Sequence, residues 1–590
     1  MPLLSLRGRV ARIARAMLRA TTLVVIASCV DARVPTQLAS MRVVPPDTVT
    51  RGTDTTTSPP DTAASVPDTV NTAAPSSPND EARVAELPRR SVAITYPRIE
   101  RDVHVAAGAD LQAAIDDARP GDALLLAPGA TYEGNFVLRN KGESDSWIVI
   151  RTDVDDITLG AAGARMTPSV ARAARLATIV SPSSRAALMT ELGANHYRLV
   201  GVEVTAREAV GDVNAIIRFG DASSAQNSVA SIAHDLIIDR SYVHGTPVLQ
   251  VRRCLMLNSA TSAVIDSWLG ECHSNVSDSQ AIVGWNGPGP YLIQNNHLEA
   301  GHEVLVFGGG TSTIADQSPS DVTVRGNHVT RPLAWKGVWQ VKNLLETKHV
   351  RRLLVEGNVF ENNWADAQAG FAFVLKSENQ NSDTPWTQST DITIRYNRIR
   401  NTGNGFNLAA NPSGLPARPA ARIVIADNII QNVNVGPYNG DGHTFQLLGA
   451  LADVVLTHNT ITSVGGQNAF ALLLGSLPVA ERLVVHSNVM MHGGYGIKGG
   501  GTAEGMPSLE HYAPGASVRG NLIVGGGNPA AYPAGNFFFA TLADAGFTQV
   551  AAGDYRLDAS SGAALATDGA IVGADVDRVD AETRGAVVDP

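Results

Sequence analysis

An asparagine recurs at nearly constant spacing through the second half of the chain, always three residues after an aliphatic residue. Successive asparagines are separated by 29 to 39 residues, and the commonest step is 31. Ser241 and Ser267 take the same place in two earlier segments. The eight asparagines are Asn296, Asn327, Asn358, Asn397, Asn428, Asn459, Asn488 and Asn521. A period of this length is typical of a solenoid, in which each repeat buries its apolar face only against its neighbours.

Each repeat between about residues 195 and 525 contains a second short apolar segment after its asparagine or serine. Two β segments in every repeat predict that equivalent strands stack into sheets, as in a parallel β-helix. The asparagines would then stack inside a turn, where each amide satisfies backbone groups of its own and adjacent rungs. We therefore expect this ladder to be structural. The second segments lie at 215–219, 281–285, 303–307, 343–346, 371–376, 405–408, 444–447, 469–473 and 496–498.

The composition fits a β-rich protein and limits its partners. The 590 residues include 55 glycines, and aromatic residues make up only 5%, a balance typical of turn-rich β structure. The net charge of −10 argues against nucleic acid as a partner, because phosphate binding needs a basic surface. It does not exclude an acidic polysaccharide, which needs only a locally basic groove.

The first 29 residues predict export. Five arginines precede a short apolar run at residues 23–26, and Ile26-Ala-Ser-Cys29 resembles the lipobox of bacterial lipoproteins. That resemblance implies an acylated Cys29 and a membrane anchor, hence an envelope lipoprotein at the outer membrane or cell surface. The alternative is an ordinary secretory signal with an incidental cysteine and a secreted product. No later stretch is long and apolar enough to span a bilayer.

Residues 30–90 are rich in Thr, Pro, Ser and Asp and lack apolar periodicity, which predicts a disordered tether. The folded domain is expected over residues 91–590. It begins with a helix at residues 111–118, with Asp110 as N-cap, followed by a strand at residues 123–126. Leu111-Gln-Ala-Ala-Ile115, Pro120-Gly-Asp122 and the strand after them resemble the opening of exported bacterial β-helix proteins of the pectate-lyase-like superfamily.

This resemblance, together with a C-terminal stretch around residues 553–575 that resembles their end cap, covers about residues 100–577. It implies an all-β fold: a right-handed, single-stranded parallel β-helix of about 10–12 rungs with an N-terminal helical cap. We expect the protein to be a monomer. Cys254 and Cys272 could form one disulfide or could be buried separately on different rungs.

Strand alternation predicts a polar row on the outside of the second strands. If the apolar residues of these strands face the core, the residues between them face outward and repeat at about 4.8 Å per rung. A polar row with this repeat suits a sugar polymer, whereas the alternative is a merely solvated face. The predicted row comprises Arg218, Glu346, Lys376, Asn407, Gln446 and Lys498.

The middle of this face is richest in candidate binding residues. Four of the seven tryptophans fall within residues 335–386, and indole faces stack on sugar rings, although tryptophans that pack loops are the alternative. The expected substrate-binding residues in this part are Trp335, Lys336, Trp339, Lys342, Trp364, Asn379 and Trp386.

Glu346-Thr-Lys348, with Lys376 one rung later, resembles the arrangement in chondroitinase B and the alginate lyases. The resemblance implies a lyase in which Glu303 and Glu346 hold a metal, Ca²⁺ being the candidate. Lys348 would be the base, and Lys376 would take the place of an arginine. The chain departs from the family because Arg-His-Gly is replaced by Lys376-Ser-Glu378 and the Glu–Lys spacing is shorter.

Three functions compete at this stage. The first is a tethered lyase that degrades an acidic polysaccharide by β-elimination. The second is a non-catalytic polysaccharide-binding or adhesive module, because no intact catalytic signature is present. The third is a structural protein of the cell envelope.

Overall fold

The computed structural model describes residues 83–161, 163–558 and 566–588. The expected signal segment, Cys29 and most of the 30–90 tether lie outside these residues, so lipidation and localisation stay predictions. Within the described part, no helix has both the length and the hydrophobicity needed to cross a membrane.

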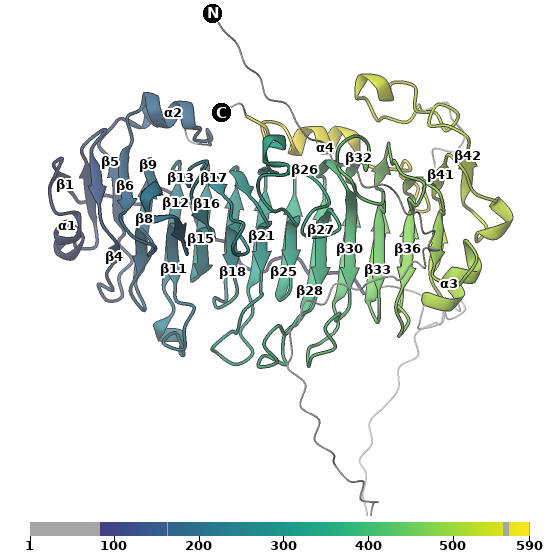
Figure 1. Ribbon diagram of the computed structural model, residues 1–590, viewed down its shortest axis with the longest axis horizontal. Helices are drawn as coiled ribbons and strands as arrows, with labels where there is room; N and C mark the ends of the chain where they lie inside the picture. Colours follow the sequence, from purple (N-terminus) through teal and green to yellow (C-terminus); the bar gives the residue numbers. More distant parts are fainter. Residues whose placement is uncertain (1–82, 162, 559–565, 589–590) are drawn as a thin grey trace, which may run out of the picture. The chain divides into compact units, whose positions relative to one another are not determined.

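Three long sheets form the domain, and every strand pairing within them is parallel (Figure 1). Sheet A consists of β1 Arg101–Val105, β2 Asp122–Leu126, β5 Ile148–Thr152, β8 Asn195–Val200, β12 His234–Asp239, β16 Ala260–Ile265, β19 Tyr291–Gln294, β22 Ser320–Arg325, β25 Val350–Glu356, β28 Ser389–Arg395, β31 Ala421–Ala426, β34 Ala452–Thr457, β37 Val484–His486 and β40 Ser517–Arg519. Sheet B consists of β3 Thr131–Glu133, β6 Ala177–Ser181, β9 Val202–Ala206, β13 Tyr242–His244, β17 Trp268–Cys272, β20 His297–Ala300, β23 His328–Thr330, β26 Val359–Asn363, β29 Arg398–Thr402, β32 Ile429–Val433, β35 Thr460–Ile461, β38 Val489–Met491, β41 Leu522–Val524 and β42 Phe537–Phe539. Sheet C consists of β4 Phe136–Leu138, β7 Leu188–Thr190, β11 Ile217–Gly220, β15 Arg253–Asn258, β18 Gln280–Gly284, β21 Glu303–Phe307, β24 Asn343–Thr347, β27 Phe371–Lys376, β30 Asn404–Ala409, β33 Phe445–Leu448, β36 Leu472–Gly475 and β39 Ile497–Gly499.

This arrangement confirms the right-handed parallel β-helix. Sheets A and B have 14 strands each and sheet C has 12, so two sheets exceed the expected 10–12 rungs. All nine predicted second segments contribute a strand to sheet C. The strands of sheet B begin directly after the recurring asparagines, and the sequence pattern did not distinguish them from the strands of sheet A.

The asparagine ladder is structural, as predicted. Each asparagine sits in the turn between sheets A and B and is fully buried. The Oδ1 atom of Asn327, for example, accepts the backbone N–H of Asn296 at 2.8 Å, and its Nδ2 donates to the Ile293 carbonyl at 2.9 Å. The ladder continues beyond the predicted series to Asn536, which accepts the N–H of Asn521. Every amide thereby satisfies groups that the turn would otherwise leave without partners.

The core inside the three sheets is apolar. Phe373 stacks on Phe406 with ring centroids 4.6 Å apart, and Phe406 stacks on Phe445 at 5.4 Å. All three rings are fully buried. Stacking equivalent aromatic residues on successive rungs fills the interior with one continuous column.

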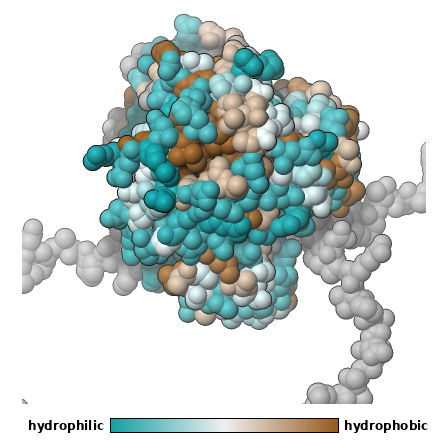
Figure 2. Space-filling view, turned by 90° about the vertical axis from the view of Figure 1, so that its left-hand side faces the viewer, coloured by the Kyte–Doolittle hydropathy of each residue, from teal (hydrophilic) through white to brown (hydrophobic). Residues whose placement is uncertain are grey.

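Helix α1, Leu111–Asp117, covers the N-terminal end as predicted. The Asp110 side chain accepts the N–H of Ala113, while Leu111 and Ile115 are buried in the core. A strand that the sequence did not predict, β1, precedes the helix. Figure 2 looks onto this end and shows a largely hydrophilic surface with a smaller hydrophobic patch near its middle, as expected of a covered core. The other helices are α2 Pro168–Ala173, α3 Met506–Tyr512 and α4 Val576–Glu582.

Cys254 and Cys272 form a disulfide between β15 and β17, with Cα atoms 5.7 Å apart. The structure thus decides between the two alternatives that the sequence left open. Both residues are fully buried, so the bond ties sheet C to sheet B from within the core.

A strap of residues 83–98 lies against the outer face of sheet A. The backbone N–H groups of Arg83, Glu86 and Arg89 donate to the side chains of Asp453, Asp391 and Asp321, respectively. Three extended residues span roughly 10 Å, which matches two rungs. The packed chain therefore begins before the boundary at residue 90 that composition suggested.

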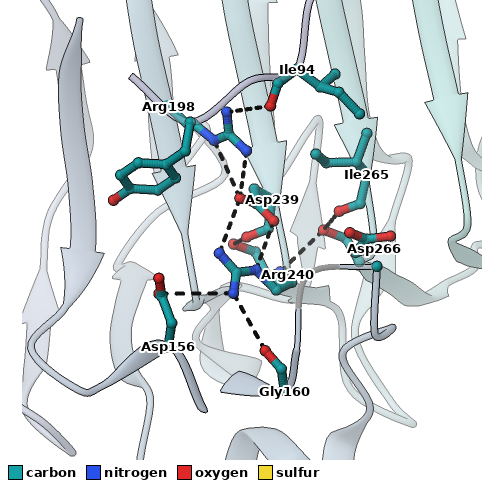
Figure 3. Close-up of polar contacts among 12 residues, drawn as sticks. Ile94, Asp156, Gly160, Arg198, Asp239, Arg240, Ile265 and Asp266 are labelled. Atoms are coloured by element: carbon teal, nitrogen blue, oxygen red, sulfur yellow. Dashed lines mark hydrogen bonds and ion pairs between the residues drawn. The ribbon is translucent and has the colours of Figure 1, made fainter. Parts of the chain in front are cut away.

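The strap continues towards the N-terminal rungs. Val92 is buried among the outward-facing Ile237, Ile265 and Leu292 of sheet A. Further along, Arg198 donates to the carbonyl of Ile94 at 2.9 Å and to Asp239 at 2.8 Å (Figure 3). The strap thus combines backbone hydrogen bonds with apolar burial.

Candidate functional site

The outer face of sheet C carries the row that strand alternation predicts. Half of the ten residues in this register are apolar, so the predicted polar row is interrupted, and Glu346 lies near its middle between Val306 and Val374. Lys376 lies on the same face, two residues further along its strand than Val374. In order, the row is Arg218, Met256, Val283, Val306, Glu346, Val374, Asn407, Gln446, Leu473 and Lys498.

Two lysines from adjacent rungs converge on Glu346. The Nζ atom of Lys376 lies 3.2 Å from Glu346 Oε1, and the Nζ of Lys348 lies 3.6 Å from the same oxygen. Asn343 Nδ2 donates to the other carboxylate oxygen at 2.9 Å. Glu346 is 1% exposed, whereas each lysine side chain keeps about one-sixth of its surface open, 16% for Lys348 and 17% for Lys376. The Glu346 carboxylate is the buried part of this cluster, and the two lysine ammonium groups are its solvent-accessible part.

A second acid lies on the preceding rung. Glu303 is 3% exposed, accepts from Gln280 Nε2 at 2.9 Å and lies 3.3 Å from the Nζ of Lys342. The same ammonium group contacts Asp278 at 2.7 Å. The structure therefore brings together the predicted residues Glu303, Glu346, Lys342, Lys348 and Lys376.

The surroundings of the two acids shift their pKa values in opposite directions. Burial by itself raises the pKa of Glu346, but Lys376, Lys348 and the Asn343 hydrogen bond outweigh it and lower the pKa to about 2. Burial also raises the pKa of Glu303, and repulsion from Glu346 adds to this, so that Lys342 does not restore its ordinary value. Glu346 is thus held as a carboxylate, whereas Glu303 is the acid that resists ionisation.

Lys376 is held as an ammonium ion. Burial lowers its pKa, but attraction to Glu346 and Glu378 outweighs this and raises the pKa above its ordinary value. The Nζ of Lys376 lies 2.6 Å from Glu378. A lysine in this environment can stabilise negative charge but is a poor proton acceptor. Lys348 instead donates to the amide oxygen of Gln380 at 2.9 Å.

Two buried amide oxygens beside the acids have no hydrogen-bond partner. They are Asn343 Oδ1 and Gln280 Oε1, and each belongs to a residue whose amide nitrogen donates to one of the two acids. Carboxylate and amide oxygens are the ligands that Ca²⁺ prefers. The residues present therefore fit a hard cation, although Lys342 and Lys376 now contact the carboxylates that would bind it.

Arg331, which the sequence did not single out, lies buried beneath the site. Its guanidinium group donates to the carbonyls of His302 and Asn343 at 3.1 and 2.9 Å, and also to Asn363. It is fully buried, and this burial lowers its pKa to about 9 despite Glu303 nearby. Because no motif marks it, only the fold identifies it as the group that fixes the backbone beside Glu303 and at Asn343.

Three of the four candidate tryptophans pack against protein. Trp335, Trp339 and Trp364 are 6%, 8% and 1% exposed and form one cluster. His273 stacks on Trp339 with centroids 3.8 Å apart. Their ring faces are thus covered, which corresponds to the loop-packing alternative. Trp386 is partly exposed, and its Nε1 donates to the Gln317 carbonyl at 3.2 Å.

The other expected binding residues are dispersed. Asn379 is 1% exposed and closes its own loop through Thr384 and the Pro416 carbonyl, while Lys336 donates to the Pro437 carbonyl. Lys498 lies over the Tyr495 ring at 4.7 Å, at the C-terminal end of sheet C. On the outer row, Gln446 donates to Asn407 at 3.3 Å. Arg218 lies 3.5 Å from Asp221, several rungs before Glu346.

A pocket of about 400 Å³ lies elsewhere, between the strap and the loop before α2. Arg198 and Arg240 both contact Asp239 at its wall, at 2.8 and 3.0 Å, and Arg240 also approaches Asp156 (Figure 3). The two arginines that line this pocket are thus paired within the protein. The lysine-rich face of sheet C remains the stronger candidate site.

Comparison with known proteins extends to the fold alone. No family model and no curated protein sequence matches the chain. Among solved structures it is similar to the PL6 family alginate lyase AlyGC (14% identity, 74% of this chain and 53% of that chain, TM-score 0.40). It is also similar to a mannuronic acid specific polysaccharide family 6 lyase enzyme from human gut microbiota (15% identity, 76% and 86%, TM-score 0.41) and to pectate lyase Pel9A (12% identity, 63% and 81%, TM-score 0.29). The chain thus spans about half the length of AlyGC, and these TM-scores carry no argument about the site.

Proposed function

We propose that the protein binds an acidic polysaccharide on the outer face of sheet C and cleaves it by β-elimination. One observation carries this proposal: Lys348 and Lys376, from adjacent rungs, hold their ammonium groups within 3.6 and 3.2 Å of the buried Glu346. A uronate polymer offers one carboxylate per sugar, which the Lys376 ammonium group can bind and polarise while Lys348 lies beside the same sugar.

In the proposed reaction, the neutral amine of Lys348 takes the proton from C5 of the uronate sugar. The electrons of that C–H bond form a C4–C5 double bond, and the C4–oxygen bond breaks. The leaving oxygen takes a proton from water or from an acid that we do not assign. Lys376, held as an ammonium ion by Glu346 and Glu378, stabilises the charge that develops on the substrate carboxylate.

The acidic side chains at this face support a metal requirement. Asp278, Glu303, Glu346 and Glu378 lie among three lysines, and burial raises the pKa of Glu303. A cation beside Glu303 would favour its carboxylate form and would add positive charge for a polyanion. We propose that Glu303, Glu346 and the unpartnered oxygen of Asn343 hold a Ca²⁺ ion, which would supply positive charge beside the substrate carboxylate.

The test is ultraviolet absorbance of the unsaturated product, because β-elimination creates a double bond conjugated with the carboxylate. The full-length protein is incubated with alginate, pectate, chondroitin and heparin-like polymers, with Ca²⁺ and then with a chelator. A rise with one polymer that the chelator abolishes supports both parts of the proposal. A flat trace with every polymer, by contrast, contradicts the lyase.

A non-catalytic polysaccharide-binding module is the second candidate. The observation that favours it is that both central lysines are engaged, Lys376 by two carboxylates and Lys348 by Glu346 and Gln380, so neither is a free base in this structure. Retention on an immobilised polymer without any product distinguishes this function from the lyase.

A further inference from the structure

Two histidines and an aspartate form a separate cluster near the start of strands β8 and β12 in sheet A. One potential ligand atom from each of His196, His234 and Asp235 lies within 4.8 Å of the other two. Within the described residues this is the one group of three His, Cys, Asp or Glu side chains that meets this distance. All three residues are partly exposed, so an ion from solvent can reach them.

The fold places these side chains together. His196 in β8 and Asp235 in β12 occupy equivalent places on adjacent strands, between residue pairs that are in register. Both have left-handed backbone conformations, with φ of 57° and 52°, and this shared conformation turns both side chains to the same side of the strands. His234 precedes Asp235 and approaches His196 with ring centroids 6.1 Å apart.

Hydrogen bonds orient the imidazole of His196. Asn195 Nδ2 donates to the carbonyls of Gly142 and Gly193, so its Oδ1 is the acceptor facing His196 Nδ1 at 2.9 Å. His196 Nδ1 must then carry the hydrogen, which leaves a lone pair on Nε2. A partner on one ring nitrogen that directs the other towards a metal is a common feature of zinc sites. Trp147 packs edge-on against this ring at 5.1 Å and restricts its rotation.

His234 places a ring nitrogen directly beside the Asp235 carboxylate. Its Nδ1 lies 2.7 Å from Asp235 Oδ2, so an ion that replaces the shared proton would contact both groups, and its Nε2 lies 3.7 Å from Glu143 Oε1. The Glu143 side chain is 85% exposed and is therefore free to approach an ion as a further oxygen ligand. Two imidazoles with one or two carboxylates form a donor set that suits a divalent transition metal better than Ca²⁺ or Mg²⁺.

We propose that His196, His234 and Asp235 bind a divalent transition-metal ion of the Zn²⁺ type. Glu143 lies on the loop before β5, so its participation would tie that loop to strands β8 and β12. This loop leads to Trp147, which packs, like the strap residue Ile94, against the apolar cluster around Val92. Bound metal would therefore stabilise the N-terminal rungs and the strap against them. The site is independent of the proposed lyase site on sheet C.

Zn²⁺ titration by calorimetry and Co²⁺ absorbance in the visible range test this site. The full-length protein, without a histidine tag, is used in excess Ca²⁺, which would occupy an all-oxygen site. We expect one Zn²⁺ per chain, Co²⁺ bands typical of nitrogen ligation, and a higher melting temperature with Zn²⁺. His196→Asn, which tolerates the left-handed backbone, and His234→Gln should each weaken Zn²⁺ binding by more than about tenfold.

His104→Ala is the matched control, because His104 is an exposed histidine beside a single carboxylate, Asp153, at 3.1 Å. It should leave Zn²⁺ binding unchanged, and metal-free melting curves should show that every variant folds. Absence of Zn²⁺ uptake by the folded wild-type protein overturns the proposal. So does uptake that both cluster variants retain. Polysaccharide cleavage is measured in parallel, since its failure would leave the zinc result intact.

Discussion

The outer faces of sheets A and C both carry charged residues on successive rungs, but only one of them satisfies its charges internally. On sheet A, each of Asp321, Asp391 and Asp453 is paired by an arginine on the next rung and also accepts a backbone N–H from the strap. On sheet C, four acidic side chains share three lysines, burial raises the pKa of Glu303, and two amide oxygens lack partners. Fully paired groups are typical of a structural surface, whereas buried polar atoms without partners are typical of a candidate binding site.

The strap explains why the charges on the outer face of sheet A are paired. Six residues with φ between 51° and 60° form a column along sheet A in which aspartate and arginine alternate. Both oxygens of each aspartate are used, and the strap also covers apolar residues on the rungs that precede the column. The column consists of Asp321, Arg352, Asp391, Arg422, Asp453 and Arg482.

Removal of the proposed base should have the largest effect. Lys348→Ala should lower product formation by roughly 10²- to 10⁴-fold, as expected for the loss of a general base, in a protein whose melting curve shows that it still folds. Lys141→Ala, which removes a lysine from the loop before β5, is the control and should retain full activity. Unchanged turnover in Lys348→Ala would show that another group takes the C5 proton.

Asp391→Ala should interrupt the pairing of aspartates and arginines on sheet A, and its effect should be on stability alone. The change removes two hydrogen bonds from Arg422, at 2.6 and 2.7 Å, and the acceptor of the Glu86 N–H. We expect a loss of about 2 kcal/mol in the free energy of unfolding by urea, because removal of a buried carboxylate leaves the groups that donate to it without partners. Asp117→Ala, on the exposed face of α1, should change it by less than about 0.5 kcal/mol. Equal effects of the two changes would contradict a structural role for the column.

Acidification should show that Glu346 stays ionised to a lower pH than an ordinary glutamate. Its pKa is lowered to about 2, so its stabilising contribution is complete above the ordinary pKa of about 4.5 and is lost as the pH falls towards 2. The difference in the free energy of unfolding between the wild type and Glu346→Gln should therefore narrow over this range. Urea titrations at a series of pH values measure it, and a constant difference would mean that the lysines do not hold Glu346 ionised.

Ca²⁺ should have the smallest effect. An ion bound only by the folded state stabilises it by mass action, and for a domain of this size we expect the melting temperature to rise by roughly 1–3 °C. Calorimetry with Ca²⁺ and with a chelator measures the shift. It should disappear in Glu346→Gln and persist in Asp391→Ala, since the latter lies on the other sheet. A shift that Glu346→Gln retains would place the ion elsewhere.

Local and periodic features could be predicted from the sequence. The asparagine spacing predicts the solenoid because each rung must satisfy the same buried turn, and alternation along the strands places Glu346 and Lys376 on one outer face. Asp110 marks the start of α1 because it caps that helix. These features depend on residues close in sequence or on a repeat visible in it.

Contacts between distant residues were decided only by the tertiary structure. The pairing of Cys254 with Cys272, the burial of Trp335, Trp339 and Trp364, and the place of Arg331 under the site all depend on which rungs and loops meet. The strap was hidden because its affinity for sheet A comes from backbone N–H groups, which every residue possesses, and from aspartates that lie more than 200 residues away. Composition can mark a segment as polar, but only the folded surface decides whether that segment finds partners.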